Sequence, residues 1–321
     1  SNSYFKNLCF LTEFPRQDGR YAIVTGGSRG IGLEIVNNLL ESGYNVVIGS
    51  SSSEVNRNLL EQMFKRKYEN SSVEVWHLDL VSLRSVKAFA EKYSSTGRPL
   101  HLLINNAGIM FVKEEYTEDG FEKHFAVNYV SHCLLTLLLL PLLAKSGTAN
   151  TYSRIINSTS CIHYVGSKDS KHLQKKAYYS KYRAYIQSKL AQIMFTYSLQ
   201  AHLSAENVYV TVNCVHPGVV NTELMSSVLW ISLVGSIGSF FLRIFLKSAK
   251  QGAETATFAA LSPEMEGIGG KYLEECRPVP SSKISQDRVL QNDLWIETWD
   301  RLKDWIPKGN AFSHWFFPIS K

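Results

Sequence analysis

The sequence predicts an α/β fold in which one doubly wound, parallel sheet is covered by helices on both faces. From residue 20 onward, short apolar runs alternate with segments of helical spacing. Such alternation is typical of βαβ units and of a parallel sheet that is buried on both sides. The first apolar run ends in a cluster of glycines. Right-handed crossovers between successive runs then produce the doubly wound arrangement.

Each predicted element follows from its local pattern. Short apolar runs predict strands at Tyr21–Thr25, Asn45–Ile48, Val73–Leu78, His101–Ile104, Arg154–Ile156 and Val208–Val212. Helical spacing predicts helices at Ile31–Glu41, Ser53–Tyr68, Ser82–Tyr93, Phe121–Leu143 and Tyr182–Leu203.

Composition limits the class of protein. The 321 residues are 45% hydrophobic with a net charge of +6, which suits one α/β domain with a sizeable core. The charge suits an anionic cofactor or membrane surface, but no motif accompanies it that would indicate nucleic-acid binding, and no metal site is predicted. The five cysteines form no CxxC pair and are odd in number, so no disulfide framework is expected and a reducing compartment is favoured.

A glycine-rich turn, Thr25-Gly26-Gly27-Ser28-Arg29-Gly30-Ile31-Gly32, follows the first predicted strand and opens the first helix. Glycines let the backbone approach a pyrophosphate closely, and the helix N-terminus supplies N–H groups and the positive end of the helix dipole. The strand-turn-helix setting disfavours the alternative of a loop that merely contains glycines. We therefore predict a dinucleotide site with contacts from Gly26, Ser28, Arg29, Gly30, Ile31 and Gly32.

Cofactor choice depends on the end of the second strand, Val47-Ile48-Gly49-Ser50-Ser51. An Asp or Glu there would hydrogen-bond a ribose 2′-hydroxyl and select NAD, and none is present. Arg29, Ser50 and Ser51 could instead hold a 2′-phosphate, so NADP(H) is favoured. Because the strand end itself carries no arginine, use of NAD(H) stays open.

Three further motifs stand where other predicted strands end, which is where open parallel sheets bind ligands. They are Asp79-Leu80, Asn105-Asn106-Ala107-Gly108 and Pro217-Gly218-Val219-Val220-Asn221-Thr222. The predicted cofactor contacts among them are Asp79, Leu80, Asn106, Ala107, Gly108, Pro217, Gly218, Val219 and Thr222.

Tyr185 and Lys189 lie at positions i and i+4 of a predicted helix and therefore share one face. A free tyrosine has a pKa of about 10, and a neighbouring ammonium lowers it by favouring the phenolate. Tyr185 could then take an alcohol proton during oxidation or return it during reduction. Both residues are also predicted cofactor contacts. An isolated YxxxK pattern is a weak signal, because both residue types are common on helices.

Two more side chains strengthen that signal. Ser160 follows a predicted strand within Asn157-Ser158-Thr159-Ser160 and could hydrogen-bond the reacting oxygen. Asn128 lies inside the predicted Phe121–Leu143 helix, where a polar side chain usually has a structural or functional role. One such role is to relay protons through water to Lys189. The alternative is an interior asparagine whose hydrogen bonds are all satisfied within the protein.

In this order, TGxxxGxG, NNAG, Asn128, Ser160, YxxxK and PG resemble the short-chain dehydrogenase/reductase family over roughly residues 19–275. The resemblance implies a Rossmann-type sheet of about seven strands and a nicotinamide cofactor. It also implies the catalytic tetrad Asn128, Ser160, Tyr185 and Lys189. Ser160 is preferred to Ser158 because the family's serine follows another small hydroxyl residue, here Thr159. Residues 1–18 and 276–321 are then N-terminal and C-terminal extensions.

The long interval between Ser160 and Tyr185 contains His163-Tyr164-Val165 and Tyr178-Tyr179-Ser180. This layout, with Gln187-Ser188-Lys189-Leu190, resembles the retinol dehydrogenase-like branch. The patterns HYV, PGVVNTEL and PEMEGIGGKYL are similar to a member of that branch that acts on polyprenols and dolichal. The resemblance implies a lipophilic isoprenoid substrate, polyprenol, dolichal or retinoid. Ile186 and His216 depart from the pattern and leave the substrate open.

An apolar segment late in the chain supports a lipid substrate independently. Leu224–Leu242 contains no charged residue and approaches the length of a membrane-spanning helix. Serines and glycines lower the hydrophobicity of this segment, and a membrane-spanning helix between two strands of one sheet would disrupt the domain. We expect a substrate lobe at about residues 223–250 whose apolar wall dips into a membrane surface. A core-covering helix pair and a true span are the alternatives.

The leading hypothesis is therefore an NADP(H)-preferring oxidoreductase that interconverts an alcohol and a carbonyl on an isoprenoid. A steroid or sterol ketone reductase and a nucleotide-binding scaffold without turnover are the alternatives, and the complete tetrad argues against the scaffold. The resemblance also suggests a homodimer through the Phe121–Leu143 and Tyr182–Leu203 helices, unless their apolar faces belong to the core.

No secretory signal pattern is visible, and the chain begins at Ser1 rather than Met, so an upstream anchor stays open. We expect a membrane-associated, cytosol-facing protein of the endoplasmic reticulum or lipid droplet.

Overall fold

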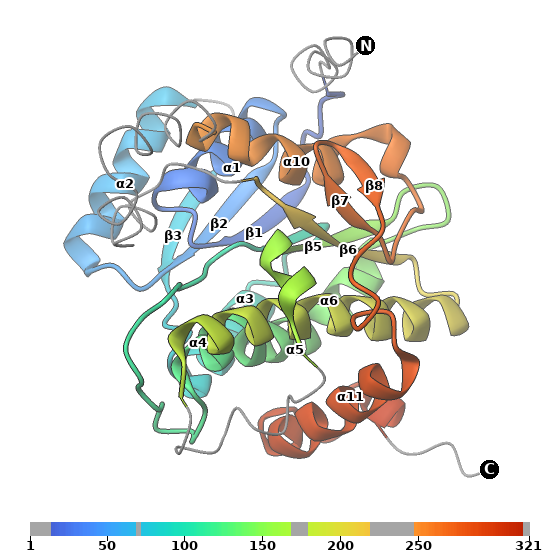
Figure 1. The fold of residues 1–321 in the computed structure, drawn as a ribbon. Coiled ribbons are helices and arrows are strands. Elements are labelled where there is room, and N and C mark those ends of the chain that lie inside the picture. The colour runs from blue at the N-terminus through green and yellow to red at the C-terminus, as the bar shows by residue number, and fades with distance from the viewer. Residues whose placement is uncertain (1–13, 69–71, 168–178, 219–246, 317–321) are drawn as a thin grey trace, which may run out of the picture.

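The structure is a computed structural model that describes residues 14–68, 72–167, 179–218 and 247–316. One sheet runs through these residues in the order β3-β2-β1-β4-β5-β6-β7-β8 (Figure 1). The strands are β1 Tyr21–Thr25, β2 Asn45–Ser50, β3 Val73–His77, β4 Leu102–Asn105, β5 Ser153–Ser158, β6 Val210–His216, β7 Tyr272–Glu274 and β8 Arg277–Val279. The order reverses between β1 and β4, which is the switch point where doubly wound sheets bind nucleotides.

The strands from β3 to β7 pair in parallel, which confirms the predicted doubly wound sheet. Every residue of β4, β5 and β6 is buried, as expected for strands covered on both faces. β8 extends the sheet by pairing antiparallel with β7. The two linking residues, Glu275 and Cys276, have φ values of 51° and 57°. Positive φ at both positions is the backbone of a two-residue hairpin turn, which explains the antiparallel edge.

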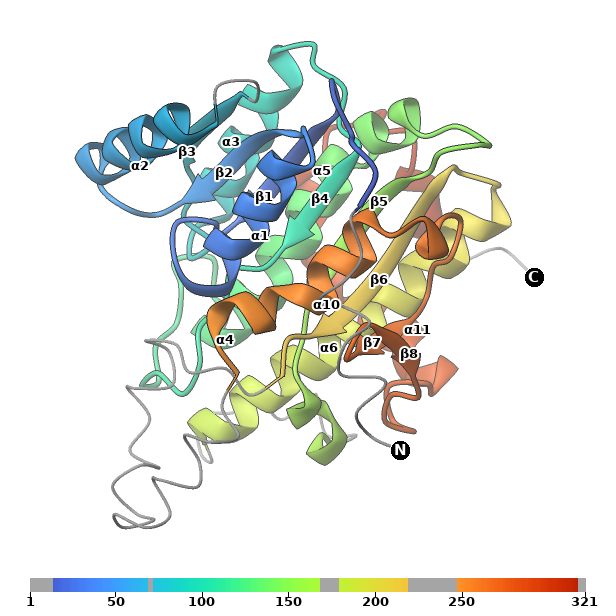
Figure 2. The same cartoon turned by 90° about the horizontal axis from the view of Figure 1, so that it is seen from above.

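Helices α1 and α10 cover one face of the sheet, and α3, α5 and α6 cover the other (Figures 1 and 2). The helices are α1 Gly30–Glu41, α2 Glu54–Lys67, α3 Leu83–Ser95, α4 Lys123–Phe125, α5 Ser131–Ser146, α6 Lys181–Ala205, α10 Ala249–Leu261 and α11 Arg288–Leu302. Each face has its own apolar core, with Ile35 and Ala256 in one and Leu134 and Phe195 in the other. The predicted helices are therefore confirmed in type, with ends that differ by a few residues.

The predicted Phe121–Leu143 helix is observed as one helical run, Lys123–Ser146, with a π-helical turn at Ala126–Val130. By length and composition the run could cross a membrane, but 83% of its most apolar window is buried inside the protein. Such burial is typical of a core helix, so the run is weak evidence for a span. Asn128 lies at the centre of the π-helical turn, a rare feature that is frequent at functional sites.

The C-terminal helix α11 packs against α6 and the π-helical turn on the side away from the sheet (Figure 1). Trp295 of α11 stacks between Phe195 and His202, with ring centroids 5.6 and 4.7 Å away. The Thr298 hydroxyl of α11 lies 2.6 Å from that of Tyr129. The C-terminal segment thus covers part of the outward surface of the long helices within the same chain.

Several predictions fall outside the described residues. The substrate lobe, including Leu224–Leu242, and the proposed cofactor contacts Val219 and Thr222 belong to this group. Among the described cysteines, Cys133, Cys161 and Cys214 are free thiols.

Candidate active site

The glycine-rich turn is shaped by close backbone approaches that no side chain could share. Gly26 has a φ of +66°, and a Cβ there would lie 2.9 Å from the Cα of Ala107. A Cβ on Gly32, in the first turn of α1, would lie 2.2 Å from the carbonyl oxygen of Gly26. Gly30, with a φ of +56°, begins the helix. Only glycines allow this turn to close against the end of β4.

Thr25 joins the glycine turn to the loop after β4. Its hydroxyl accepts hydrogen bonds from the backbone N–H groups of Asn106 and Ala107, both at 3.0 Å. Asn106 also donates from its side-chain amide to the Thr25 carbonyl at 3.1 Å. Beneath this junction, Nε2 of His132 lies 2.9 Å from the Thr25 hydroxyl, and its Nδ1 lies 3.2 Å from the carbonyl oxygen of Asn128.

These contacts assign the tautomer of His132. The Asn128 carbonyl can only accept, so Nδ1 carries the proton and Nε2 accepts from the Thr25 hydroxyl. Burial lowers the pKa of His132 to about 4, so the ring is neutral at pH 7. The sequence analysis missed His132, because a histidine inside an apolar helix resembles any other core residue.

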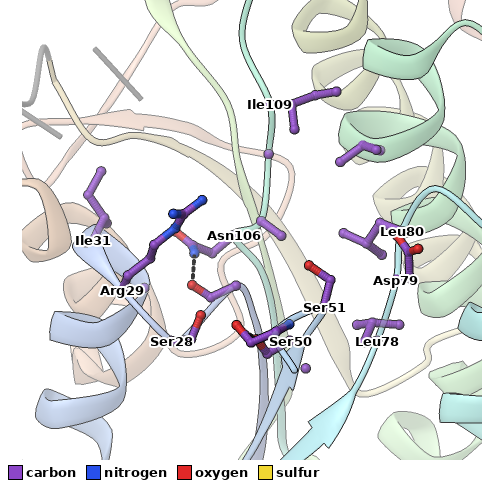
Figure 3. Close-up of a pocket in the computed structure, with 18 of the residues that line it drawn as sticks. Ser28, Arg29, Ile31, Ser50, Ser51, Leu78, Asp79, Leu80, Asn106 and Ile109 are labelled. Atoms are coloured by element: carbon purple, nitrogen blue, oxygen red, sulfur yellow. Dashed lines mark hydrogen bonds between the residues drawn. The ribbon is translucent and has the colours of Figure 1, made fainter. Parts of the chain in front are cut away.

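A cavity of about 660 Å³ opens beside the glycine turn, at the carboxyl ends of β1, β2, β3 and β4 (Figure 3). The predicted cofactor residues that line it are Gly26, Ser28, Arg29, Gly30, Ile31, Gly32, Ser50, Ser51, Asp79, Leu80, Asn106, Ala107 and Gly108. The lining residues that the sequence analysis missed are Gly49, Ser52, Leu78, Val81, Ile109, Val127 and Ala249. Motifs far apart in the sequence thus meet at one edge of the sheet.

The cavity fits an elongated, anionic dinucleotide. The glycine turn lines it, and the N-terminus of α1 points into it. No carboxylate stands at the end of β2, where Ser50 donates to the Ser52 hydroxyl at 3.0 Å and Ser51 is exposed. Figure 3 shows Ser28, Arg29, Ser50 and Ser51 lining this part of the cavity.

Tyr185 and Lys189 are both buried in α6, and neither is among the residues that line the cavity, so their predicted cofactor contacts stay predictions. A Cβ on Gly108 would lie 3.6 Å from Nζ of Lys189. Nζ donates to the carbonyl oxygen of Ser158 at 2.9 Å and to Oε1 of Gln192 at 3.0 Å. Burial without a carboxylate partner lowers the pKa of Lys189 to about 7. Gln192 is a lysine partner that the YxxxK pattern does not reveal.

Burial dominates the pKa of Tyr185. It raises this pKa to about 12, and the interaction with Ser160 offsets the rise only in part. Nζ of Lys189 lies 5.9 Å from the centroid of the Tyr185 ring. The lowering of the Tyr185 pKa by the Lys189 ammonium stays a prediction.

Ser160 is held by the turn that follows it. Its hydroxyl accepts the backbone N–H of Ile162 at 3.3 Å and so caps the 3-10 turn Cys161–Val165. Ser160 lowers the pKa of the Tyr185 phenol through a hydrogen-bonding interaction, whereas Ser158 contributes its carbonyl to Lys189. The choice of Ser160 over Ser158 as the catalytic serine stays a prediction.

The side chain of Asn128 is fully occupied by structural contacts. Its Oδ1 accepts from the backbone N–H of Ile109 at 2.8 Å, and its Nδ2 donates to the Ile109 carbonyl at 3.0 Å and to the Ser188 hydroxyl at 2.9 Å. The amide therefore locks the loop after β4 onto α6. These contacts are compatible with a satisfied interior asparagine, and the relay through water to Lys189 stays a prediction.

Aromatic side chains cover the phenol ring. Phe111 has a φ of 56°, unusual for a bulky residue. Its ring packs edge-on against Tyr185, with centroids 5.2 Å apart, and against Tyr182 at 4.8 Å. His124 lies 6.4 Å from Tyr185 by the same measure. The positive φ of Phe111 thus brings its ring against that of Tyr185, a contact that sequence patterns did not reveal.

Pro217 and Gly218, which follow β6, are not among the residues that line the cavity. Gly218 has a φ of +85°, and a Cβ there would lie 2.7 Å from Cδ of Lys247. Neither Pro217 nor Gly218 lines the cavity among the described residues, so their predicted cofactor contact stays a prediction. Within the same described ranges, no group of His, Cys, Asp or Glu side chains gathers as metal ligands.

Known proteins resemble this chain in sequence. Polyprenol dehydrogenase of Danio rerio is 42% identical over 288 residues, covering 90% of this chain and 88% of the relative. Polyprenol dehydrogenase of Homo sapiens is 40% identical over 285 residues, covering 89% and 86%. Retinol dehydrogenase 12 of Homo sapiens is 35% identical, covering 86% and 84%.

Solved structures share the fold. An uncharacterized protein of Mycobacterium Paratuberculosis superposes with a TM-score of 0.71 at 28% identity, covering 91% of this chain and 96% of that one. The RhlG/NADP active-site complex of Pseudomonas aeruginosa has a TM-score of 0.64 at 25% identity, covering 82% and 97%. The sequence pattern of the family described as "short chain dehydrogenase" matches residues 20–229. The chain belongs to the short-chain dehydrogenase family.

Proposed function

We propose that this protein interconverts an alcohol and a carbonyl on a lipophilic isoprenoid, of the polyprenol/dolichal or retinoid type, with a nicotinamide cofactor. The observation that carries the proposal is the buried Tyr185 phenol beside Ser160, one turn of α6 before Lys189, whose Nζ would lie 3.6 Å from a Cβ on the cavity-lining Gly108. The relatives named polyprenol dehydrogenase and retinol dehydrogenase, matched over most of their length, support the substrate class.

The residues present fit such a cofactor, and different residues would bind it and transfer the proton. The glycine turn and the residues lining the cavity would hold it, and when bound it supplies or accepts the hydride. Tyr185, whose pKa is about 12, keeps its proton at neutral pH and can donate it to a carbonyl oxygen during reduction. Ser160 orients the phenol by a hydrogen bond, and Lys189, when protonated, stabilises the phenolate that remains.

Preference for NADP(H) over NAD(H) is part of the proposal. It is supported by Arg29, Ser50 and Ser51 along the cavity and by the lack of a carboxylate at the end of β2. Two of the similar solved structures are complexes with NADP.

We further propose that the protein acts at a membrane surface, facing the cytosol on the endoplasmic reticulum or a lipid droplet. A long isoprenoid is dissolved in lipid, and the uncharged Leu224–Leu242 segment suits contact with it. A homodimer through α5 and α6 is less compatible with the packing, because α11 already lies against α6 and the π-helical turn.

The proposal is tested by following NADPH and NADH oxidation by the detergent-solubilised protein, with polyprenal, dolichal, retinal and a keto-steroid offered in parallel. Tyr185→Phe, which keeps the ring and removes the proton donor, is the control. Turnover of an isoprenoid aldehyde that Tyr185→Phe loses by at least about a thousandfold supports the proposal, since proton transfer and oxyanion stabilisation are both lost. Turnover of only the steroid favours a steroid reductase, and cofactor binding without any turnover favours a scaffold protein.

A further inference from the structure

A buried histidine links the catalytic serine to the C-terminal part of the chain. His163 has no exposed surface. Its Nδ1 lies 2.8 Å from the carbonyl oxygen of Ser160. Its Nε2 lies 3.1 Å from the backbone nitrogen of Ser282, which is 119 positions further along the chain.

The two contacts assign the state of the ring. The Ser282 N–H can only donate, so Nε2 must accept, and the proton then lies on Nδ1 and is donated to the Ser160 carbonyl. Burial lowers the pKa of His163, which favours this neutral form. Both nitrogens are used, and the ring is packed against Tyr164 and Tyr272 at centroid distances of 4.1 and 4.8 Å.

The segment on the other side of His163 is itself anchored. The Ser281 hydroxyl lies 2.6 Å from the hydroxyl of Tyr197 on α6 and 2.8 Å from the hydroxyl of Ser285. Gln291 of α11 donates to the Ser285 carbonyl at 2.7 Å. Residues 281–285 therefore bridge the Cys161–Val165 turn to α6, which is the helix that carries Tyr185 and Lys189.

We propose that His163 is a positioning residue that sets the place of the Ser160 hydroxyl relative to Tyr185, using residues 281–285 as a fixed support. The inference rests on the proposed catalytic role of Ser160. The supporting segment lies beyond residues 20–229, which match the family pattern. Part of the active-site geometry thus comes from the C-terminal region of the chain.

Two isosteric substitutions of His163 test its bond to Ser160 and its bond to Ser282 individually. The side-chain nitrogen of asparagine can replace Nδ1, so His163→Asn keeps the donor to Ser160 and loses the acceptor for Ser282. His163→Gln places its amide near Nε2, so it keeps the Ser282 contact and loses the donor to Ser160. We expect His163→Gln to lower kcat about tenfold or more with little change in KM, and His163→Asn to recover most of that loss.

Two controls exclude a merely structural role. Tyr164→Phe removes a hydroxyl that donates to the Pro280 carbonyl. This substitution therefore weakens the contact between the Cys161–Val165 turn and the segment around residues 280–285, but it leaves the bond between His163 and Ser160 in place. It should lower thermal stability without lowering kcat. In a double-mutant cycle, His163→Gln should cost nothing further once Ser160 has been replaced by Ala, because the histidine acts through that hydroxyl. Equal kcat values for the Asn and Gln variants, or fully additive losses, would overturn the inference.

Amide hydrogen exchange tests the same bonds without any turnover. His163→Gln should accelerate exchange at Ile162 and His163, whose N–H groups are bonded to Ser160, whereas His163→Asn should accelerate it at Ser282. If no carbonyl compound is turned over by the unmodified protein, the proposed function fails, and this reciprocal pattern still decides the role of His163. Identical exchange patterns for the two variants would refute it.

Discussion

Replacing Lys189 with Met should change how the stability of this protein depends on pH. The ammonium is buried, and its recorded partners are a carbonyl and an amide oxygen, from Ser158 and Gln192. Its pKa is lowered from 10.5 to about 7 because burial disfavours the charge. Methionine fills a similar volume with no charge, so the comparison isolates the titration of this one group.

The number of protons bound by the folded and unfolded states determines whether the free energy of unfolding rises or falls with pH. Below about pH 7, Lys189 is protonated in both the folded and the unfolded state, and the folded protein bears the full cost of the buried charge. Between pH 7 and 10.5 the folded state releases the proton while the unfolded chain keeps it. The unfolded state then binds more protons, so the free energy of unfolding rises with pH, by about 1.4 kcal/mol per pH unit. Between pH 6 and 9 the gain is about 2–3 kcal/mol.

The measurement is urea unfolding of the cofactor-free protein and of Lys189→Met at several pH values between 6 and 9. Tryptophan fluorescence and circular dichroism should give coincident transitions. Buried cysteines, tyrosines and histidines titrate in both proteins, so their effects cancel in the difference. The unmodified protein should gain about 2–3 kcal/mol over the variant across this range. A difference that stays constant with pH would show that Lys189 remains charged in the folded state and would refute the reasoning.

Three other substitutions test separate parts of the structure. Arg154→Met removes a buried guanidinium that donates to three carbonyls at the end of α10 and to the Glu266 carboxylate. It should lower the free energy of unfolding by about 3 kcal/mol in urea titrations, and an unchanged value would contradict the assigned role. Gly32→Ala would place a Cβ 2.2 Å from a backbone oxygen. NADPH affinity, measured by fluorescence titration, should fall at least about a hundredfold, equivalent to about 2.7 kcal/mol, and undiminished binding would exclude this turn as the cofactor site. Thr25→Val leaves two backbone N–H groups and His132 without their hydroxyl partner. It should lower the melting temperature by several degrees, whereas Thr25→Ser should lower it far less.

Several features were predictable because they depend on local patterns. The apolar runs that became β1 to β6 and the helical spacing of α1, α3 and α6 are properties of neighbouring residues. The glycine turn could be located because its backbone conformation excludes other residues. Strand ends could be grouped into one cavity, because parallel strands present their carboxyl ends at the same edge of a sheet.

The hydrogen-bond partners that hold the site could not be predicted in this way. The contacts of His132 with Thr25 and of His163 with Ser282 join residues that are distant along the chain, so no local pattern reports them. The antiparallel β8 and the positive φ of Phe111 likewise depend on how neighbouring segments meet.

The sequence by itself determined the doubly wound sheet and the place of the dinucleotide cavity, and it predicted the catalytic residues Asn128, Ser160, Tyr185 and Lys189, because periodicity, glycine content and the order of motifs are properties of the chain alone. Only the tertiary structure decided the protonation of these groups. Burial raises the pKa of Tyr185 to about 12 and lowers that of Lys189 to about 7, shifts that the spacing of the two residues along the helix does not indicate. Desolvation depends on what surrounds a group in three dimensions, and no spacing along the chain reports it.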